Sequence, residues 1–252
     1  ILRFHAVIWP AMLMAAGIDI PKKVFAHGWL LVGGEKMSKS KLTGIAPSDI
    51  TDHFGVDAFR YYFLRAIPFG SDGSFSWEDM SARYTSELAN DFGNLASRLA
   101  AMIEKYCGGK VPAIAKDAGL AEALQIAADK ADAAMVALDF QGGINAVMDF
   151  CKQVNGFVTV KEPWILAKDP ANQAALEEVL YNTAESLRAL AVLLHPVMPA
   201  TTEILWESLG AKASLGEIGK QEISKVARWG QLPQGAAVTK TPVLFPRLEV
   251  KE

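Results

Sequence analysis

The feature that most constrains the fold is a long run of helical pattern from Ser76 to about residue 209, interrupted only by short breaks. Apolar residues recur there at every third or fourth position, as on the buried face of amphipathic helices. The first helix is predicted to begin at a cap made by Ser76 and Asp79 and to run to about Cys107, before Gly108. Its predicted buried residues are Tyr84, Leu88, Leu95, Leu99, Met102 and Tyr106. Further helices are predicted at 120–137, 140–161, 173–194 and 200–209, so the larger part of the chain is expected to be an α-helical bundle.

The residues before this run predict a different, mixed region. Apolar residues share one helical face over residues 1–16, with Pro10 expected to kink or restart that helix and Gly17 to end it. Residues 23–32 alternate as a strand or strand pair would. A short helix is predicted from Pro47, with Ser48 as its N-cap and Gly55 as its stop, and a second helix at 57–65. The apolar stripe of this second helix is predicted to be Phe59, Tyr62 and Phe63.

Composition sets bounds on size and partners. The 252 residues are 51% hydrophobic and 21% charged, which suits one or two domains with a substantial core. The formal charge of −3 means that any nucleic-acid binding must come from a local basic patch. The two cysteines, Cys107 and Cys151, lie outside any C-x-x-C pattern, so no metal site and a reducing, cytoplasmic setting are expected. No apolar run reaches the roughly 18 residues of a membrane span, and no secretory leader is visible.

The segment Lys36-Met37-Ser38-Lys39-Ser40 carries the strongest chemical signal. Lysine ammonium groups suit phosphate oxygens, and serine hydroxyls add hydrogen-bond donors. A cationic loop of this kind, preceded by two glycines, is suited to a polyphosphate whose charge grows during reaction. An ordinary K-x-x-K pattern is also found on solvated basic surface loops.

Two patterns in the helical region are suited to RNA. Asn90, Asn94 and Arg98 recur at intervals of four and can form one helix face that reads base edges and phosphates, or an ordinary solvated face. In the turn between two helices, Pro163 precedes Trp164. That indole can either cap the bundle core or offer a stacking surface to an unpaired base.

Taken together, these segments resemble the methionyl-tRNA synthetases, a family of class I aminoacyl-tRNA synthetases. The resemblance rests on the K-M-S-K-S loop with its flanks H-G-W and L-T-G, the F-H-x-x-x-W-P-A helix at 4–11, the N-x-x-x-N-L-A-x-R helix at 90–98 and the Pro-Trp turn. It implies three regions. Residues 1–32 would be the C-terminal part of a Rossmann-type catalytic domain, 33–75 the K-M-S-K-S loop with the stem-contact fold, and 76–252 the anticodon-binding bundle.

The resemblance also implies site residues and ligands. Lys36 and Lys39 would be catalytic. The expected ATP-binding residues are Lys36, Met37, Ser38, Lys39, Ser40, His27 and Gly28. The expected methionine-binding residues are Ile1, His5 and Trp9, and the expected anticodon-binding residues are Asn90, Asn94, Arg98 and Trp164. ATP with Mg²⁺, methionine and tRNA(Met) are the implied ligands of a cytoplasmic monomer with no zinc site in this chain and no membrane partner.

One expected signature is missing, because the H-I-G-H tetrapeptide of class I synthetases does not occur in this sequence. The zinc-bearing connective insertion is absent too. We therefore expect the chain to correspond to the C-terminal half of the family and to be inactive alone. The missing N-terminal half of the same enzyme is an expected partner. Three alternatives stay open: a class I synthetase for leucine, isoleucine, valine or cysteine, a tRNA-binding module without chemistry, and a structural helical bundle. The 4–11 helix and the Asn/Arg/Trp set argue against another class I synthetase.

Overall fold

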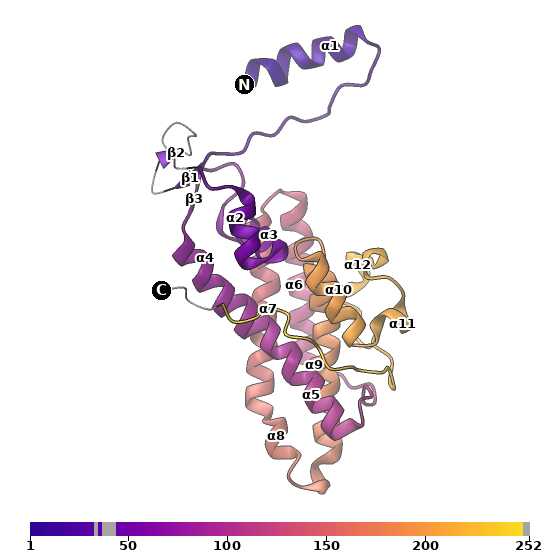
Figure 1. The fold of residues 1–252 in the computed structure, drawn as a ribbon. Helices are drawn as coiled ribbons and strands as arrows, with labels where there is room; N and C mark the ends of the chain where they lie inside the picture. Colours follow the sequence, from indigo (N-terminus) through magenta and orange to yellow (C-terminus); the bar gives the residue numbers. More distant parts are fainter. Residues whose placement is uncertain (33–34, 37–43, 249–252) are drawn as a thin grey trace.

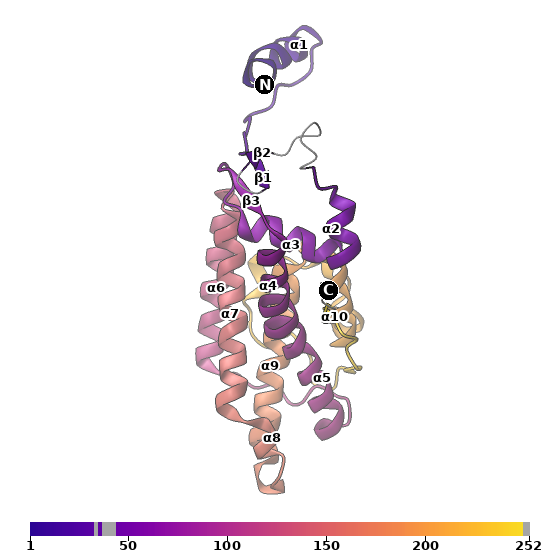
Figure 2. The same cartoon turned by 60° about the vertical axis from the view of Figure 1, so that its left-hand side comes forward.

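The structure is a computed structural model that describes residues 1–32, 35–36 and 44–248. Its elements follow one another along a long axis in three parts (Figures 1 and 2). A short helical segment projects at one end, a small sheet with two helices follows, and a bundle of long helices forms the remainder. The described chain is mainly helical, in agreement with the predicted fold class.

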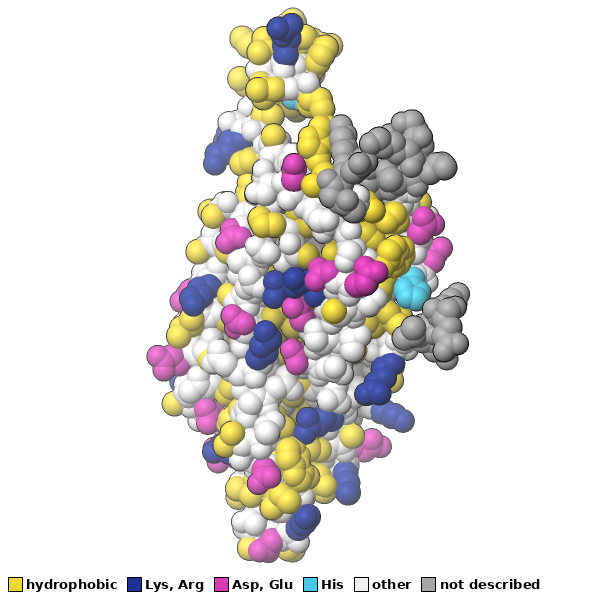
Figure 3. Space-filling view, turned by 90° about the vertical axis from the view of Figure 1, so that its left-hand side faces the viewer, with side chains coloured by type: hydrophobic (Ala, Val, Ile, Leu, Met, Phe, Trp, Pro, Cys, Tyr) yellow, Lys and Arg dark blue, Asp and Glu magenta, His cyan; other side chains and the backbone are white. Residues whose placement is uncertain are grey.

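The projecting segment contains η1 (Phe4–Ile8), a π-helix, and α1 (Trp9–Ala15). The change from π to α winding falls directly before Pro10, which has no N–H to donate to the preceding turn. The segment 18–29, without regular secondary structure, then leads back to the sheet. None of the residues of η1 and α1 is buried, and hydrophobic side chains cover this end of the molecule (Figure 3).

The sheet has three short strands in the order β2-β1-β3. They are β1 (Leu30–Val32), β2 (Glu35–Lys36) and β3 (Gly73–Phe75). β1 pairs antiparallel to β2 and parallel to β3. The predicted strand over 23–32 is therefore wrong for 23–29, which form no regular secondary structure before β1 begins at Leu30. The Trp29 carbonyl accepts from the Gly73 N–H of β3 at 2.9 Å.

Two helices lie between β2 and β3 in the chain, α2 (Pro47–Phe54) and α3 (Val56–Ala66), separated by Gly55 at φ 84° as predicted. The predicted N-cap Ser48 is wrong. Pro47 occupies the first helical turn, so the cap is Ala46, whose N–H donates to the Asp49 carboxylate at 3.0 Å. In α3 the residues with the deepest burial are Tyr61 and Tyr62, whereas Phe59 and Phe63 are half-buried.

The bundle begins with three consecutive helices that form one continuous rod, in which the winding changes from α to π and back to α. It consists of α4 (Trp77–Arg83), the π-helix η3 (Tyr84–Gly93) and α5 (Asn94–Cys107). The predicted cap is confirmed, since Ser76 Oγ accepts from the Asp79 N–H at 3.0 Å. Of the predicted stripe, Tyr84, Leu88, Leu95 and Leu99 are buried, and Met102 and Tyr106 are half-buried. The π winding was not predicted, because it leaves the apolar pattern nearly unchanged.

The remaining helices surround α9 (Gln173–Leu194), which is buried without interruption from Val179 to Leu194. It packs against α5, α6, α7, α8, α10 and α12. The other elements are α6 (Ala118–Val136), α7 (Phe140–Lys161), α8 (Pro163–Leu166), the 3-10 helix η4 (Pro170–Asn172), α10 (Pro199–Ser208), α11 (Ala211–Leu215), the 3-10 helix η5 (Ile218–Lys220) and α12 (Ile223–Val226). The four further predicted helices agree with α6, α7, α9 and α10 to within two residues.

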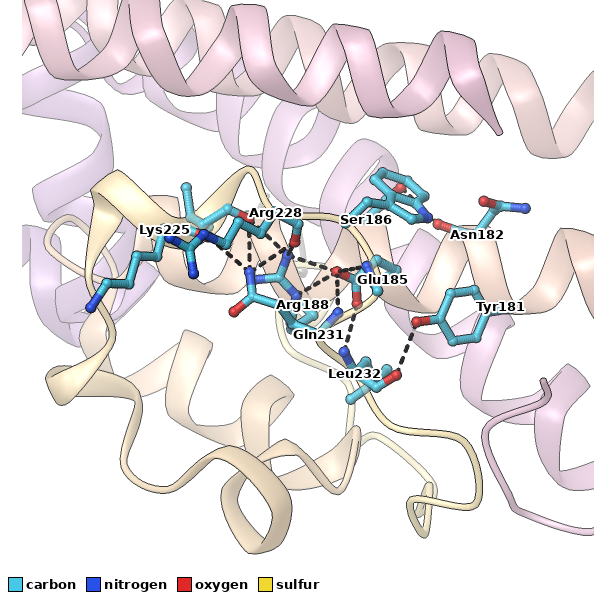
Figure 4. Close-up of polar contacts among 12 residues, drawn as sticks. Tyr181, Asn182, Glu185, Ser186, Arg188, Lys225, Arg228, Gln231 and Leu232 are labelled. Carbon is cyan, nitrogen blue, oxygen red and sulfur yellow. Dashed lines mark hydrogen bonds and ion pairs between the residues drawn. The ribbon is translucent and has the colours of Figure 1, made fainter. Parts of the chain in front are cut away.

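The C-terminal tail packs back onto earlier parts of the bundle, as predicted. Trp229 Nε1 donates to the carbonyl of Ala115 at 2.8 Å, and Tyr84 Oη donates to the carbonyl of Pro246 at 2.8 Å. A buried ion pair between Glu185 and Arg188 holds the segment after α12 against α9 (Figure 4). The tail thereby closes the bundle along one side of α9.

Polar contacts join the helices beside the sheet to the bundle. The Thr201 N–H in α10 donates to Asp57 Oδ2 at 2.6 Å, and Arg60 donates to the carbonyls of Pro196 and Val197 at 2.7 and 2.9 Å. Residues of α3 therefore cap the start of α10 and hold the link between α9 and α10. Each helix of the described ranges is too short or too polar to span a membrane.

Candidate functional site

Arg98 and Trp164, which are far apart in the sequence, meet at one place on the bundle. The Arg98 guanidinium lies over the Trp164 ring, with its Cζ atom 5.4 Å from the ring centroid. This is within the range of a cation–π interaction. Both side chains are half-buried, and the indole also packs against the bundle core. The ring thus combines the two roles considered from the sequence, as a partial core contact and a partly accessible surface.

A strained turn positions Trp164. Glu162, between α7 and α8, has φ 44° and ψ 58°, the left-handed conformation that residues with a side chain rarely adopt. Pro163 then opens α8 with its fixed φ. Strain of this kind, of order 1–3 kcal/mol, persists where surrounding structure enforces it and is common at functional sites. It sets the direction in which the chain presents the ring.

Asn90 and Asn94 lie on the same helical rod as Arg98, and both are exposed. Asn90 belongs to the last turn of η3, and Asn94 is the first residue of α5. Their amides each offer two donors and an acceptor, and the guanidinium offers further donors in a planar fork. Together with a flat ring this set can stack an unpaired base, hydrogen-bond its edge and neutralise a phosphate.

Sequence analysis missed Asn155 on α7, which lies behind this rod. Its Nδ2 atom donates to the carbonyl of Asp91 at 2.9 Å. Asp91 itself is half-buried, and burial raises the pKa of its carboxyl. No sequence signal marks Asn155, because its partner is a backbone carbonyl 64 positions away.

The predicted ATP-binding residues are only partly described. His27 and Gly28 line a cavity of about 230 Å³ together with apolar residues of α3, of 67–71 and of α7. The His27 ring Nδ1 lies 2.8 Å from the carbonyl of Gly28. Lys36 lies in β2, where only its backbone is described, and Met37, Ser38, Lys39 and Ser40 fall outside the described residues.

Gly28 also has a packing role. A Cβ atom there would lie 2.1 Å from the carbonyl oxygen of Ser71, closer than any side chain allows. The next residue, Trp29, donates its N–H to Asp72 Oδ1 at 2.6 Å. Glycine at this position lets the approach to β1 pack against the turn before β3.

The predicted methionine-binding residues lie on the projecting segment. His5 and Trp9 line an open groove with Phe4, Ile8 and Met12, and the His5 ring Nδ1 lies 3.0 Å from the carbonyl of Ile1. Figure 1 shows this segment apart from the sheet. The structure therefore does not bring Ile1, His5 and Trp9 together with His27 and Gly28. Among residues 1–32, 35–36 and 44–248, no group of three or more acidic, His or Cys side chains could hold a metal ion.

Two family models match the chain. The model described as "tRNA synthetases class I (M)" covers residues 1–100, and that described as "Anticodon-binding domain of tRNA ligase" covers residues 117–235. Methionine–tRNA ligase of Streptomyces coelicolor is 62% identical over 258 aligned residues, which cover 100% of this chain and 48% of the relative. That of Bacillus subtilis is 40% identical, over 100% of this chain and 38% of the relative. The chain thus spans half or less of the length of these relatives.

Solved structures agree with these matches. The free form of Mycobacterium tuberculosis methionyl-tRNA synthetase superimposes with a TM-score of 0.83 at 33% identity, covering 99% of this chain and 48% of that one. The same enzyme in complex with methionyl-adenylate gives 0.84 at 37% identity, covering 98% and 48%. The sequence signatures, the helical bundle with its Arg–Trp face and these matches lead to one conclusion: the chain belongs to the methionyl-tRNA synthetases of class I.

Proposed function

We propose that this chain is part of a methionine–tRNA ligase, which activates methionine with ATP and transfers it to tRNA(Met). The observation that carries the RNA-binding part is the contact of Arg98 with Trp164 beside exposed Asn90 and Asn94. In this proposal the methionine carboxylate attacks the α-phosphorus of ATP and pyrophosphate leaves. The terminal adenosine of the tRNA then attacks the adenylate carbonyl and AMP leaves. No covalent enzyme intermediate is needed, so catalysis consists of positioning and charge stabilisation.

On the catalytic side, we assign Lys39 and Lys36 to the charge that develops on the leaving pyrophosphate, with Mg²⁺ accompanying ATP. Met37, Ser38, Ser40, His27 and Gly28 complete the proposed ATP site. Ile1, His5 and Trp9 form part of the proposed methionine pocket, where an apolar, aromatic wall suits a polarisable thioether.

On the RNA side, Trp164 offers the stacking surface for an unpaired anticodon base. Arg98, held over the ring, offers donors to a base edge or a phosphate, and Asn90 and Asn94 read base edges on the same face. The three proposed regions, 1–32, 33–75 and 76–252, would divide catalysis from anticodon recognition. A tRNA-binding module without chemistry is a second candidate, supported by the contact of Arg98 with Trp164 and by the separation of η1 and α1 from the sheet.

The test of the RNA side is binding of an anticodon stem-loop with the sequence CAU to the 252-residue chain. We expect Trp164→Ala to weaken binding by about 1–3 kcal/mol, the usual contribution of one stacked base, and Trp164→Phe to retain most of it. Arg98→Ala should weaken binding and reduce its salt dependence if the guanidinium meets a phosphate. Lys220→Ala, which removes an exposed charge in η5, is the control. Equal affinity of the Trp164→Ala variant for CAU and unrelated loops, unchanged from the parent chain, would contradict the proposal.

Methionine-dependent exchange of pyrophosphate into ATP, measured on the intact protein that contains this chain, tests the catalytic side. Exchange with methionine supports the ligase, and exchange with leucine, isoleucine, valine or cysteine instead would assign another class I synthetase. Tight CAU binding without any exchange would favour the binding module.

A further inference from the structure

We infer that Asn155 is a positioning residue for the anticodon face: its side chain holds the π-wound segment that carries Asn90 in register with Asn94 and Arg98. The inference rests on the proposed function and assigns a role to a residue that would not itself touch the RNA. It is carried by a hydrogen bond between two helices at the point where the winding of one of them changes.

The orientation of the Asn155 amide is determined by its partners. Its Nδ2 atom lies 2.9 Å from the carbonyl of Asp91 and 3.1 Å from the carbonyl of Cys151. Both partners are acceptors only, so the amide must turn its NH₂ group toward them. The Cys151 thiol also lies near, with Sγ 3.7 Å from the same Asp91 carbonyl. Two side chains of one turn of α7 thus converge on a single backbone oxygen of η3.

The Asp91 carbonyl oxygen lies close to the point where the rod changes from π to α winding. Asp91 follows Asn90 and lies in the last turn of η3, three residues before Asn94. The N–H of Asn94 bonds to the carbonyl of Ala89, a π-type i→i+5 bond, and α winding resumes from there. π-helical turns are rare and occur frequently at functional sites. A side chain that donates to a carbonyl at such a transition can select this winding over the α alternative.

Loss of the π winding would turn the Asn90 side chain about the helix axis by a large angle. An α-helix turns by about 100° per residue, so a shift of one residue in register would rotate Asn90 off the face that Arg98 shares with Trp164. At the other end of the segment, Glu87 accepts from Tyr61 Oη at 2.5 Å and pairs with Arg65 and Arg83. The segment is therefore held by α3 before Asn90 and by α7 after it, while the Asn90 side chain stays exposed.

The experiment compares Asn155→Ala with the parent chain, using labelled stem-loops that carry CAU or a single substitution at each anticodon position. We expect Asn155→Ala to bind the CAU loop about tenfold more weakly, the effect of one lost hydrogen bond, and to discriminate less between CAU and its variants. Asn155→Ser, which keeps a shorter donor, should fall between the two. Gln153→Ala, an exposed residue on the same helix, should bind as the parent does.

Two readouts separate positioning from a general structural role. Because Asn155 acts through the asparagines, its substitution should cost less than a further twofold in a chain that already carries Asn90→Ala and Asn94→Ala. Hydrogen exchange of the backbone amides at 89–95 should accelerate in Asn155→Ala while α9 keeps its protection.

The inference is overturned by unchanged discrimination, by an equal loss for every stem-loop, or by losses that add fully to those of the asparagines. If Asn155→Ala does not fold, Asn155→Ser decides by the same criteria. A parent chain that does not distinguish CAU from the other loops would instead defeat the proposed function, and the inference with it.

Discussion

The projecting segment 1–29 and the helical bundle show the same sequence pattern with opposite burial. Phe4 and Met12, on the apolar face of the first helix, are 62% and 64% exposed, whereas Leu88 and Leu99 in the bundle are each 1% exposed. More than half of the large exposed hydrophobic side chains of the described residues belong to 1–29. The comparison teaches that helical periodicity states which face a helix can bury, and that burial itself depends on a partner element.

The bundle differs from the segment in a second way, because it buries charged groups and satisfies them. Glu185 is fully buried, and its two carboxylate oxygens accept from the Arg188 side chain and from the N–H groups of Gly230, Gln231 and Leu232 (Figure 4). A buried ion pair of this kind is costly to break, since either partner left alone is an uncompensated charge.

The largest contrast should appear in thiol chemistry. Burial raises the pKa of Cys151 to about 12, so at pH 8 the thiol stays protonated and the reactive thiolate is scarcer by roughly 10³-fold than in a free cysteine. We expect Cys151 to react with iodoacetamide at least that much more slowly than a cysteine introduced by Met12→Cys. The rates can be followed by mass spectrometry of the labelled peptides. Comparable rates at the two positions would show that this part of the bundle opens readily.

The next effect concerns the buried ion pair. Glu185→Ala removes the carboxylate that neutralises Arg188 and leaves three backbone N–H groups without their acceptor. We expect the free energy of unfolding to fall by about 3–5 kcal/mol. Urea denaturation measures it, with Glu178→Ala, an exposed glutamate of the same helix, as the control. A loss no greater than that of the control would mean that the tail 226–232 is not held by this pair.

A smaller effect is expected at the junction of α3 with the bundle. Asp57 accepts from the N–H of Thr201 in the first turn of α10 and is 8% exposed. Asp57→Ala should destabilise the chain by about 1–2 kcal/mol, as the loss of a helix cap does. Asp57→Asn, which keeps an acceptor oxygen, should recover part of the loss in the same urea titration. Identical stability of the alanine and asparagine variants would argue against the cap.

Much of the bundle could be predicted from the sequence, because its helices are long, periodic and bounded by ordinary signals. Ser76 capped the first rod as expected, and Gly55 separated α2 from α3. The errors arose where a non-local or finely balanced contact decides the outcome: the residues before β1 that form no strand, the N-cap at Ala46 and the π winding of η3. At the candidate site the pattern predicted which residues share the rod, but only the structure shows Arg98 over Trp164 and Asn155 behind Asp91.

The smallest effect is expected in the projecting segment itself. Phe4 and Met12 line an open groove and are exposed, so replacing them by glutamate removes little buried apolar area. We expect the double variant Phe4→Glu and Met12→Glu to change the free energy of unfolding by less than about 0.5 kcal/mol, the usual range for surface substitutions. Binding of an apolar dye such as anilinonaphthalene sulfonate should fall at the same time, because the exposed apolar face supplies a site for it.

The matched pair Leu88→Glu and Leu99→Glu places the same charges in the core and should abolish folding. A double variant of Phe4 and Met12 that loses several kcal/mol of stability would show that this face is covered in solution. The segment would then bury its apolar face as the bundle helices do, and the two regions would differ only in which partner covers them.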